Sequence, residues 1–304
     1  MDITKAFIKA KQPCADGFRW YLRNATADDT YQQLLDALVA AGRVEDACWL
    51  LDQFGPTDAV CLLDEVDAPA IVYAGTLHVR GALHVDTVVR AGRDLRAGDG
   101  IRAGRVQTGG DLRCEAALTC DTTVEADGDL LVAWNLDAGG PVSAERVRVG
   151  WDLTCRAALR ARGDVWVGGG LSLAGLFDGA RGLRVAEDVH CAAGIRAGHG
   201  IECGATLRCA GHLDAGWGIR ADGAVLAEGA IRAGESICAG DDIRAGSGYG
   251  IYAGLDVRDE AWEASAQVRA RRRPGGLRSG WWAGYAAQAG ELAAGRATVL
   301  PSDP

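Results

Sequence analysis

The chain has 304 residues and a formal net charge of −9 at pH 7, with 43 glycines and only 4 phenylalanines. The acidic balance disfavours unspecific nucleic-acid binding, which depends on Lys and Arg at phosphates, and no stretch approaches the roughly 18 apolar residues of a membrane span. Residues 1–13 contain three lysines and no apolar run, so no secretory signal is evident and we expect a cytoplasmic protein.

Residues 1–65 predict a small helical domain. The segment "DDTYQQLLDALVAAG" has apolar residues at helical spacing, acidic residues at its start and Gly42 at its end. "VEDACWLLDQFG" repeats this pattern and stops at Gly55 and Pro56, and "DGFRWYLRN" indicates a shorter helix before them. We expect three or four helices that pack on the first coil of the next domain and cover its open strand edges.

Residues 66–258 follow a six-residue repeat. From residue 147 onward a large apolar residue stands at every sixth position, and a small or medium side chain stands two positions after it. Residues 71–101 follow the same rule, with slips of one residue between the two stretches. The large apolar positions of the unbroken series are Val147, Leu153, Leu159, Val165, Leu171, Phe177, Leu183, Val189, Ile195, Ile201, Leu207, Leu213, Ile219, Val225, Ile231, Ile237 and Ile243.

Each unit reads as a short strand with alternating faces. The first and third side chains point inward, the second points outward, and Gly, Asp, Ser or Ala then permit a sharp bend. Because one such strand cannot bury its inner face alone, the units must stack into coils that share a continuous core. With three strands per coil, a coil holds roughly 18 residues. Residues 71–257 then predict about ten coils of a mainly β, three-sided β-helix.

Outward residues 18 positions apart support three faces per coil. Like charges directly opposite destabilise paired strands, whereas opposite charges stabilise them. Two outward series alternate in sign, which predicts a structural ladder for many of the arginines. The first ladder is Arg160, Asp178, Arg196, Asp214 and Arg232, and the second contains Arg184, Glu202 and Arg220.

The phrases "GIRAGHGIECG", "AIRAGESICAGDDIRAGSG" and "RDLRAGDGIRAG" resemble the polymer-forming bactofilin family over about residues 71–257. The resemblance implies a right-handed β-helix with three six-residue strands per coil, and end-to-end assembly into filaments. The left-handed hexapeptide acyltransferases are a rival resemblance. Their pattern differs in phase, because here the small residue follows the aliphatic residue by two positions and Arg often stands where those proteins carry Gly.

Residues 259–304 leave the repeat and form a predicted C-terminal cap or tail. The run "QVRARRRPGGLRSGWW" is basic and ends in two tryptophans, which could cover the last coil. Trp and Arg are also the residues enriched in binding hot spots. The alternative interpretation is therefore a partner-binding segment formed by Arg271, Arg272, Arg273, Trp281 and Trp282.

The sequence predicts no catalytic, cofactor or metal site. His199 and His212 fall at turns and could imitate the base of a hexapeptide acyltransferase, but the matching repeat pattern is missing. No CxxC pair supports a zinc site. Six cysteines occupy the inward small position, where a free thiol packs as a small hydrophobe. They are Cys114, Cys120, Cys155, Cys191, Cys203 and Cys209.

Three functions from different classes remain open. The first is a non-catalytic scaffold that binds a protein partner, for example an immunity protein whose acidity suits a basic toxin domain. The second is a bactofilin-like polymer that binds itself, and the third is a hexapeptide-type acyltransferase. End-to-end assembly needs two open coil faces, whereas this repeat is flanked by about 65 and 45 residues of other sequence. The flanking segments favour the scaffold.

Overall fold

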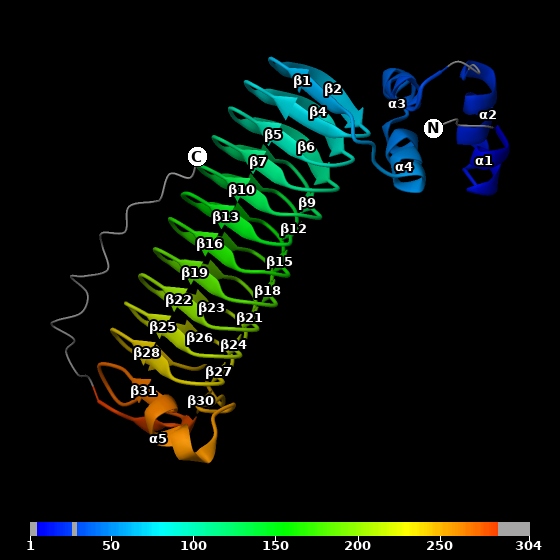
Figure 1. Cartoon of the computed structure of the whole chain (residues 1–304). Helices are drawn as coiled ribbons and strands as arrows, with labels where there is room; N and C mark the ends of the chain where they lie inside the picture. Colours follow the sequence, from blue (N-terminus) through cyan, green and yellow to red (C-terminus); the bar gives the residue numbers. More distant parts are fainter. Residues whose placement is uncertain (1–4, 26–28, 285–304) are drawn as a thin grey trace.

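The structure is a computed structural model that describes residues 5–25 and 29–284. Helices come first, and a long stack of short parallel strands follows (Figure 1). The helices are α1 (Lys5–Ala10), α2 (Ala15–Asn24), α3 (Tyr31–Ala40) and α4 (Val44–Phe54), with a 3-10 turn η1 (Asp259–Ala261) and α5 (Trp262–Ser265) near the C-terminal end. None of the described helices is long and apolar enough to cross a membrane.

The strands form a three-sided β-solenoid, as the repeat predicts. Face 1 is a 13-stranded parallel sheet. Its strands are β1 (Val60–Leu63), β3 (Thr76–Val79), β5 (Leu95–Ala97), β7 (Leu112–Cys114), β10 (Leu130–Val132), β13 (Val147–Val149), β16 (Val165–Val167), β19 (Leu183–Val185), β22 (Ile201–Cys203), β25 (Ile219–Ala221), β28 (Ile237–Ala239), β31 (Gln267–Arg269) and β33 (Trp281–Trp282).

The other two faces belong to a second parallel sheet, which is continuous in the first three coils. The strands β2 (Val66–Tyr73), β4 (Leu83–Ala91) and β6 (Ile101–Thr108) run through both faces. Face 2 continues with β8 (Leu118–Cys120), β11 (Leu136–Ala138), β14 (Leu153–Cys155), β17 (Leu171–Leu173), β20 (Val189–Cys191), β23 (Leu207–Cys209), β26 (Val225–Ala227) and β29 (Ile243–Arg244). Face 3 continues with β9 (Val124–Ala126), β12 (Val142–Ala144), β15 (Leu159–Ala161), β18 (Phe177–Gly179), β21 (Ile195–Ala197), β24 (Leu213–Ala215), β27 (Ile231–Ala233), β30 (Ile251–Tyr252) and β32 (Leu277–Ser279).

The predicted inward and outward positions are confirmed along the repeat. In β15 the first and third residues are buried and the second is exposed. The same pattern recurs in other coils, for example in β21 and β25. The solenoid has about 12 turns rather than the ten expected. The difference arises because strand pairing begins at β1 and continues through β33, where the six-residue pattern is no longer regular. The right-handed winding stays a prediction.

The helices pack against the side of the first three coils, next to the ends of β2 and β4 (Figure 1). Their core joins Val72 of β2 and Val88 of β4. Two ion pairs extend the contact, from Arg90 to Asp52 at 2.9 Å and from Arg105 to Glu45 at 2.7 Å. The N-terminal helices thus bind several coils laterally.

At one corner of the first coil, the side chain of Gln32 on α3 makes the backbone hydrogen bonds that a neighbouring strand would otherwise make. Its side-chain amide donates to the carbonyl of Val72 at 3.0 Å, and its carbonyl accepts from the N–H of Ala74 at 2.9 Å. The expectation that the helices cover the open edge of the first coil is correct for this corner alone. In β1, Val60 and Leu62 are 59% and 58% exposed, and the strand pairs with β3 on one side only among the described residues.

We predict that Gln32→Leu frees the amide of Ala74 and destabilises the helical region by about 1–3 kcal/mol, because two backbone groups lose their partners. Hydrogen exchange across residues 72–75 should accelerate, and the urea midpoint followed by helical circular dichroism should fall. Gln53→Leu on α4 is the control, since the Gln53 side chain makes no hydrogen bond to a described residue. Unchanged exchange at Ala74 would contradict this role for Gln32.

At the C-terminal end, strand pairing continues past an irregular segment. β31 adds to β28 and β33 adds to β31, while η1 and α5 lie in the connection between β30 and β31. Ala266, Val268 and Ala270 are completely buried there, so the last described strands extend the core. Residues 285–304 of the predicted cap lie outside the described part of the chain.

Candidate functional site

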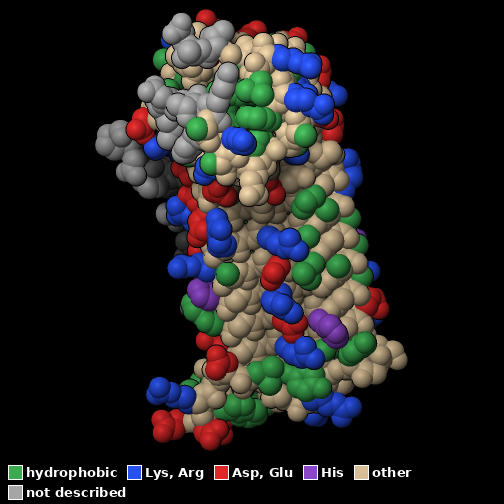
Figure 2. Space-filling model, turned by 90° about the vertical axis from the view of Figure 1, so that its right-hand side faces the viewer, with side chains coloured by type: hydrophobic (Ala, Val, Ile, Leu, Met, Phe, Trp, Pro, Cys, Tyr) green, Lys and Arg blue, Asp and Glu red, His purple; other side chains and the backbone are tan. Residues whose placement is uncertain are grey.

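The predicted ladder lies in one column on face 3. Arg160, Asp178, Arg196, Asp214 and Arg232 are register neighbours from β15 to β27. Figure 2 shows basic and acidic side chains alternating down this face. The guanidinium of Arg232 lies 3.3 Å from the carboxylate of Asp214. Such exposed pairs contribute little individually, and their alternation fits stacked parallel strands.

The predicted C-terminal partner residues lie in two groups. Arg271 and Arg272 reach back to the preceding coil, Arg271 to Asp241 at 3.9 Å and Arg272 to Asp242, whose pKa the guanidinium lowers through a side-chain hydrogen bond. Arg273 is exposed.

Trp281 and Trp282 form β33, the last strand of face 1, and the indole of Trp281 donates to the carbonyl of Glu263 at 2.7 Å. The tryptophans therefore belong to the same face as β16 and its Trp166, a relation that the sequence analysis did not identify.

The outward residues of face 1 form a column that is rich in arginine, and we call it the face 1 column. It differs from the ladder of face 3 because acidic residues do not alternate with the basic ones over most of its length. In coil order it contains Arg96, Arg113, Leu131, Arg148, Trp166, Arg184, Glu202 and Arg220.

Trp166 lies between two guanidinium groups in the middle of this column. The central carbon of Arg148 is 5.3 Å from the ring centroid and that of Arg184 is 5.1 Å from it. Both distances are within the range of cation–π attraction. Arg184 also pairs with Glu202 at 2.7 Å, whereas Arg113 and Arg148 form no ion pair with any described residue. The column therefore presents unneutralised positive charge beside an aromatic ring.

Further exposed tryptophans border face 1. Trp134 and Trp151 occupy the same turn position in successive coils, and the amide of Trp151 donates to the carbonyl of Trp134. Trp217 lies on the opposite corner, stacked on His199 with ring centroids 4.0 Å apart. The exposed fractions are 60% for Trp134, 66% for Trp151, 45% for Trp166, 52% for Trp217, 38% for Trp281 and 39% for Trp282. All of these indoles lie on face 1 or at its corners.

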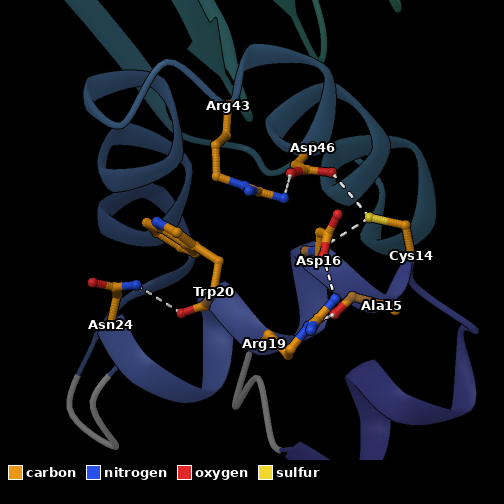
Figure 3. A network of polar contacts seen from close by, with 9 residues as sticks. Cys14, Ala15, Asp16, Arg19, Trp20, Asn24, Arg43 and Asp46 are labelled. Atoms are coloured by element: carbon orange, nitrogen blue, oxygen red, sulfur yellow. Dashed lines mark hydrogen bonds and ion pairs between the residues drawn. The ribbon is translucent and has the colours of Figure 1, made fainter.

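A separate cavity of about 210 Å³ lies among the helices. Its lining is mostly apolar and includes Trp20, Leu34 and Trp49, and a polar network lies at its rim (Figure 3). There the thiol of Cys14 accepts from the N–H of Gly17 at 3.1 Å and lies 3.7 Å from the carboxylate of Asp46.

The rim charges of this cavity are already paired, Asp46 with Arg43 and Glu45 with Arg105. The cavity thus offers apolar volume, but the rim carboxylates are engaged within the protein. This makes the cavity a weaker candidate than face 1.

The turn histidines take part in packing contacts. His199 stacks on Trp217, and the Nδ1 atom of His212 accepts from the N–H of Ala230 at 3.0 Å. In residues 5–25 and 29–284, no group of three or more His, Cys, Asp or Glu side chains is placed to hold a metal ion.

The six repeat cysteines are buried, as predicted from their position. Burial raises the pKa of the Cys209 thiol from 9.0 to about 12, and it raises the pKa of the other five as well. These thiols therefore stay protonated and unreactive in the folded protein at neutral pH.

We predict that stability falls in alkaline solution as these thiols ionise. Above about pH 9 the unfolded chain loses thiol protons that the folded chain retains, so the unfolded state is favoured progressively up to about pH 12. Cys209→Ala should reduce the fall of the urea midpoint between about pH 8 and about pH 10. Cys14→Ala, which removes an exposed thiol, should leave the fall unchanged. Equal effects of the two substitutions would contradict the prediction.

Residues 1–54 match the model of the YdhT N-terminal domain. The match covers the helical region and ends where α4 ends, so it does not extend to the solenoid or to the face 1 column. No curated protein and no solved structure matches the chain.

The predicted second ladder, Arg184, Glu202 and Arg220, forms the last part of the face 1 column, but its continuation through Trp166 and Arg148 to Arg96 was not predicted. The signal was present in residues 18 positions apart, such as Arg148, Trp166 and Arg184. Slips of one residue shift the spacing to 17 between Arg96 and Arg113 and between Leu131 and Arg148. A fixed period therefore does not align the first half of the column with the second.

Proposed function

We propose that this chain is a non-catalytic β-solenoid scaffold that binds a protein partner through face 1. The single observation that carries the proposal is the face 1 column with its flanking tryptophans. Trp and Arg are the side chains most enriched in binding hot spots. Here they project from a rigid parallel sheet, so little conformational freedom is lost when a partner binds.

Opposite charges on neighbouring strands account for Arg184, Glu202 and Arg220 in this column, but not for the part from Arg96 to Trp166. Stacked strands are stabilised by opposite charges on neighbouring outward positions, and face 3 follows that rule from Arg160 to Arg232. On face 1, Arg96 and Arg113 are instead direct neighbours of the same sign. Residues that break a local rule without a stabilising gain mark functional sites.

Site-specific photo-crosslinking in cells tests the proposal. A photoreactive residue at Leu131, between Arg113 and Arg148, should give an adduct with a partner protein, and the same residue at Ser172 on face 2 should not. The identified partner should then bind the purified chain, and Trp166→Ala should weaken that binding. No adduct at Leu131, or equal adducts at both positions, would contradict binding through face 1.

An immunity protein that neutralises a toxin is one form of this proposal. Face 1 is basic, so a basic toxin domain would have to contact the acidic corners of the solenoid. The crosslinking positions separate these cases, because a partner held at the corners would react poorly from the centre of face 1.

End-to-end self-assembly is the second candidate function. It is favoured by the open outer edge of β1, where Val60 and Leu62 are exposed and lie next to an unpaired strand edge in the described structure. Exposed edge strands are templates for pairing with another chain. Pro69, which lacks an N–H group, makes the neighbouring strand β2 of the same coil less suited to such pairing.

A further inference from the structure

We infer that face 1 binds an extended acidic segment of a protein, an inference that rests on the proposed function and names the partner's chemistry. The face 1 column carries five arginines and one glutamate between β5 and β25. Three of the arginines lie within 4 Å of a carboxylate, namely Arg96, Arg184 and Arg220, whereas Arg113 and Arg148 have no ion-pair partner among the described residues. The ligand of such a column is anionic. Its aromatic members add apolar contact area, so the anion must also carry apolar groups.

The face 1 column is narrow, and its width fits a single extended peptide chain. Each strand of face 1 is three residues long in the central coils, roughly 10 Å, and one outward side chain stands at its middle. Acidic residues border the column at both corners. On one corner they are Asp94, Asp111, Asp129 and Asp164, and on the other Asp99, Glu115, Asp152 and Asp188.

These acidic borders disfavour nucleic acid. A duplex about twice as wide as the column would place phosphates against the corner carboxylates, and phosphate contacts supply most nucleic-acid affinity. A single extended peptide can keep its carboxylates over the central arginines. Arg113 and Arg148 are the best placed to receive them, because neither has an ion-pair partner among the described residues.

Trp166 supplies the apolar part of the site. The guanidinium groups of Arg148 and Arg184 both lie over its ring, and the residue is 45% exposed. Trp151 adds a second exposed ring at the corner of the neighbouring coil. An acidic segment with interspersed apolar residues fits this combination of charges and rings.

Fluorescence anisotropy with the purified full-length chain tests this inference. The probe is a fluorescein-labelled peptide of repeating Asp-Glu-Leu. It should bind in a salt-dependent manner. The double variant Arg113→Gln and Arg148→Gln should lower its affinity about tenfold or more, because charge-assisted hydrogen bonds are lost. The matched control, Arg160→Gln with Arg196→Gln on face 3, should change the affinity less than about twofold.

Trp151→Ala gives an independent readout, because Ala205 occupies the corresponding turn in another coil and the substitution should not disturb folding. This substitution should also lower the affinity of the chain for the peptide. Equal loss in the face 3 control would overturn the placement on face 1. A second peptide, in which Lys replaces Asp and Glu, and oligothymidylate serve as competing ligands. Tighter binding of either one than of the Asp-Glu-Leu peptide would overturn the acidic-peptide assignment. If the peptide fails while crosslinking at Leu131 succeeds, this inference falls and the proposed scaffold function stands.

Discussion

Phe177→Ala is expected to lower the free energy of unfolding by about 3–5 kcal/mol, the largest effect of any substitution considered for this protein. Phe177 is completely buried in β18 and is the one phenylalanine in the inward series. The other inward residue of the same strand is Gly179, and a Cβ there would lie 2.8 Å from the ring. The large ring thus fills the volume that Gly179 leaves empty.

The two positions should therefore be coupled. Phe177→Leu leaves a cavity and Gly179→Ala overpacks the ring, so each should destabilise the protein by about 1–3 kcal/mol. The double substitution recreates the pair found one coil earlier in β15, where Leu159 and Ala161 occupy the equivalent positions. We expect it to be close to the wild type in stability, which is strong coupling in a double-mutant cycle.

Urea unfolding of the four proteins measures this coupling. Leu226→Ala, at an outward position of β26, is the control and should cost less than about 1 kcal/mol. Additive effects of the Phe177 and Gly179 substitutions would show that the two residues do not share one packing volume.

Asp111→Ala is expected to have the second-largest effect, about 1–3 kcal/mol. The corner residues before the strands of face 1 hold successive coils together through their side chains. Asp94 accepts from the N–H of Asp111 at 3.0 Å, and Asp111 accepts from the N–H of Asp129 at 2.9 Å. Alanine at 111 leaves the N–H of Asp129 without this acceptor.

Asp111→Asn is the matched variant, because it keeps an oxygen acceptor and removes the charge. Asn135 makes the equivalent bond at another corner, where it accepts from the N–H of Asp152 at 3.1 Å. The asparagine variant should therefore stay within about 0.5 kcal/mol of the wild type in urea unfolding. A loss equal to that of the alanine variant would mean that the charge of Asp111, and not its acceptor, holds the coils.

The architecture could be predicted from the sequence because the residue pattern of each strand shows which side chains point inward and which point outward. The triplet of a large apolar, a polar and a small residue fixes the inward and outward positions, and the ladder from Arg160 to Arg232 fixes three strands per coil. Both features are local or follow a constant period. The prediction of the inward cysteines, such as Cys155, was correct for the same reason.

The helix packing, the terminal coils and most of the face 1 column depend on contacts that do not follow the repeat, so they could not be predicted from it. The lateral packing of the helices relies on single residues such as Gln32 and Arg105, which lie 40 and 60 positions from their partners. The coils formed by β31 and β33 pair across an irregular insertion, so ten coils were expected where about 12 exist. Only Arg184, Glu202 and Arg220 of the face 1 column were predicted, and its continuation to Arg96 was missed because the spacing shifts between 17 and 18 residues.

The most direct test of the central claim, that the faces rather than the ends of this solenoid make its contacts, is the mass of the purified full-length chain in solution. Size-exclusion chromatography with light scattering should give a mass that does not change with concentration, and negative-stain microscopy of the same sample should show discrete particles. A mass that rises with concentration, or filaments that disappear in a Val60→Lys and Leu62→Lys variant, would contradict the claim and place self-assembly through β1 first.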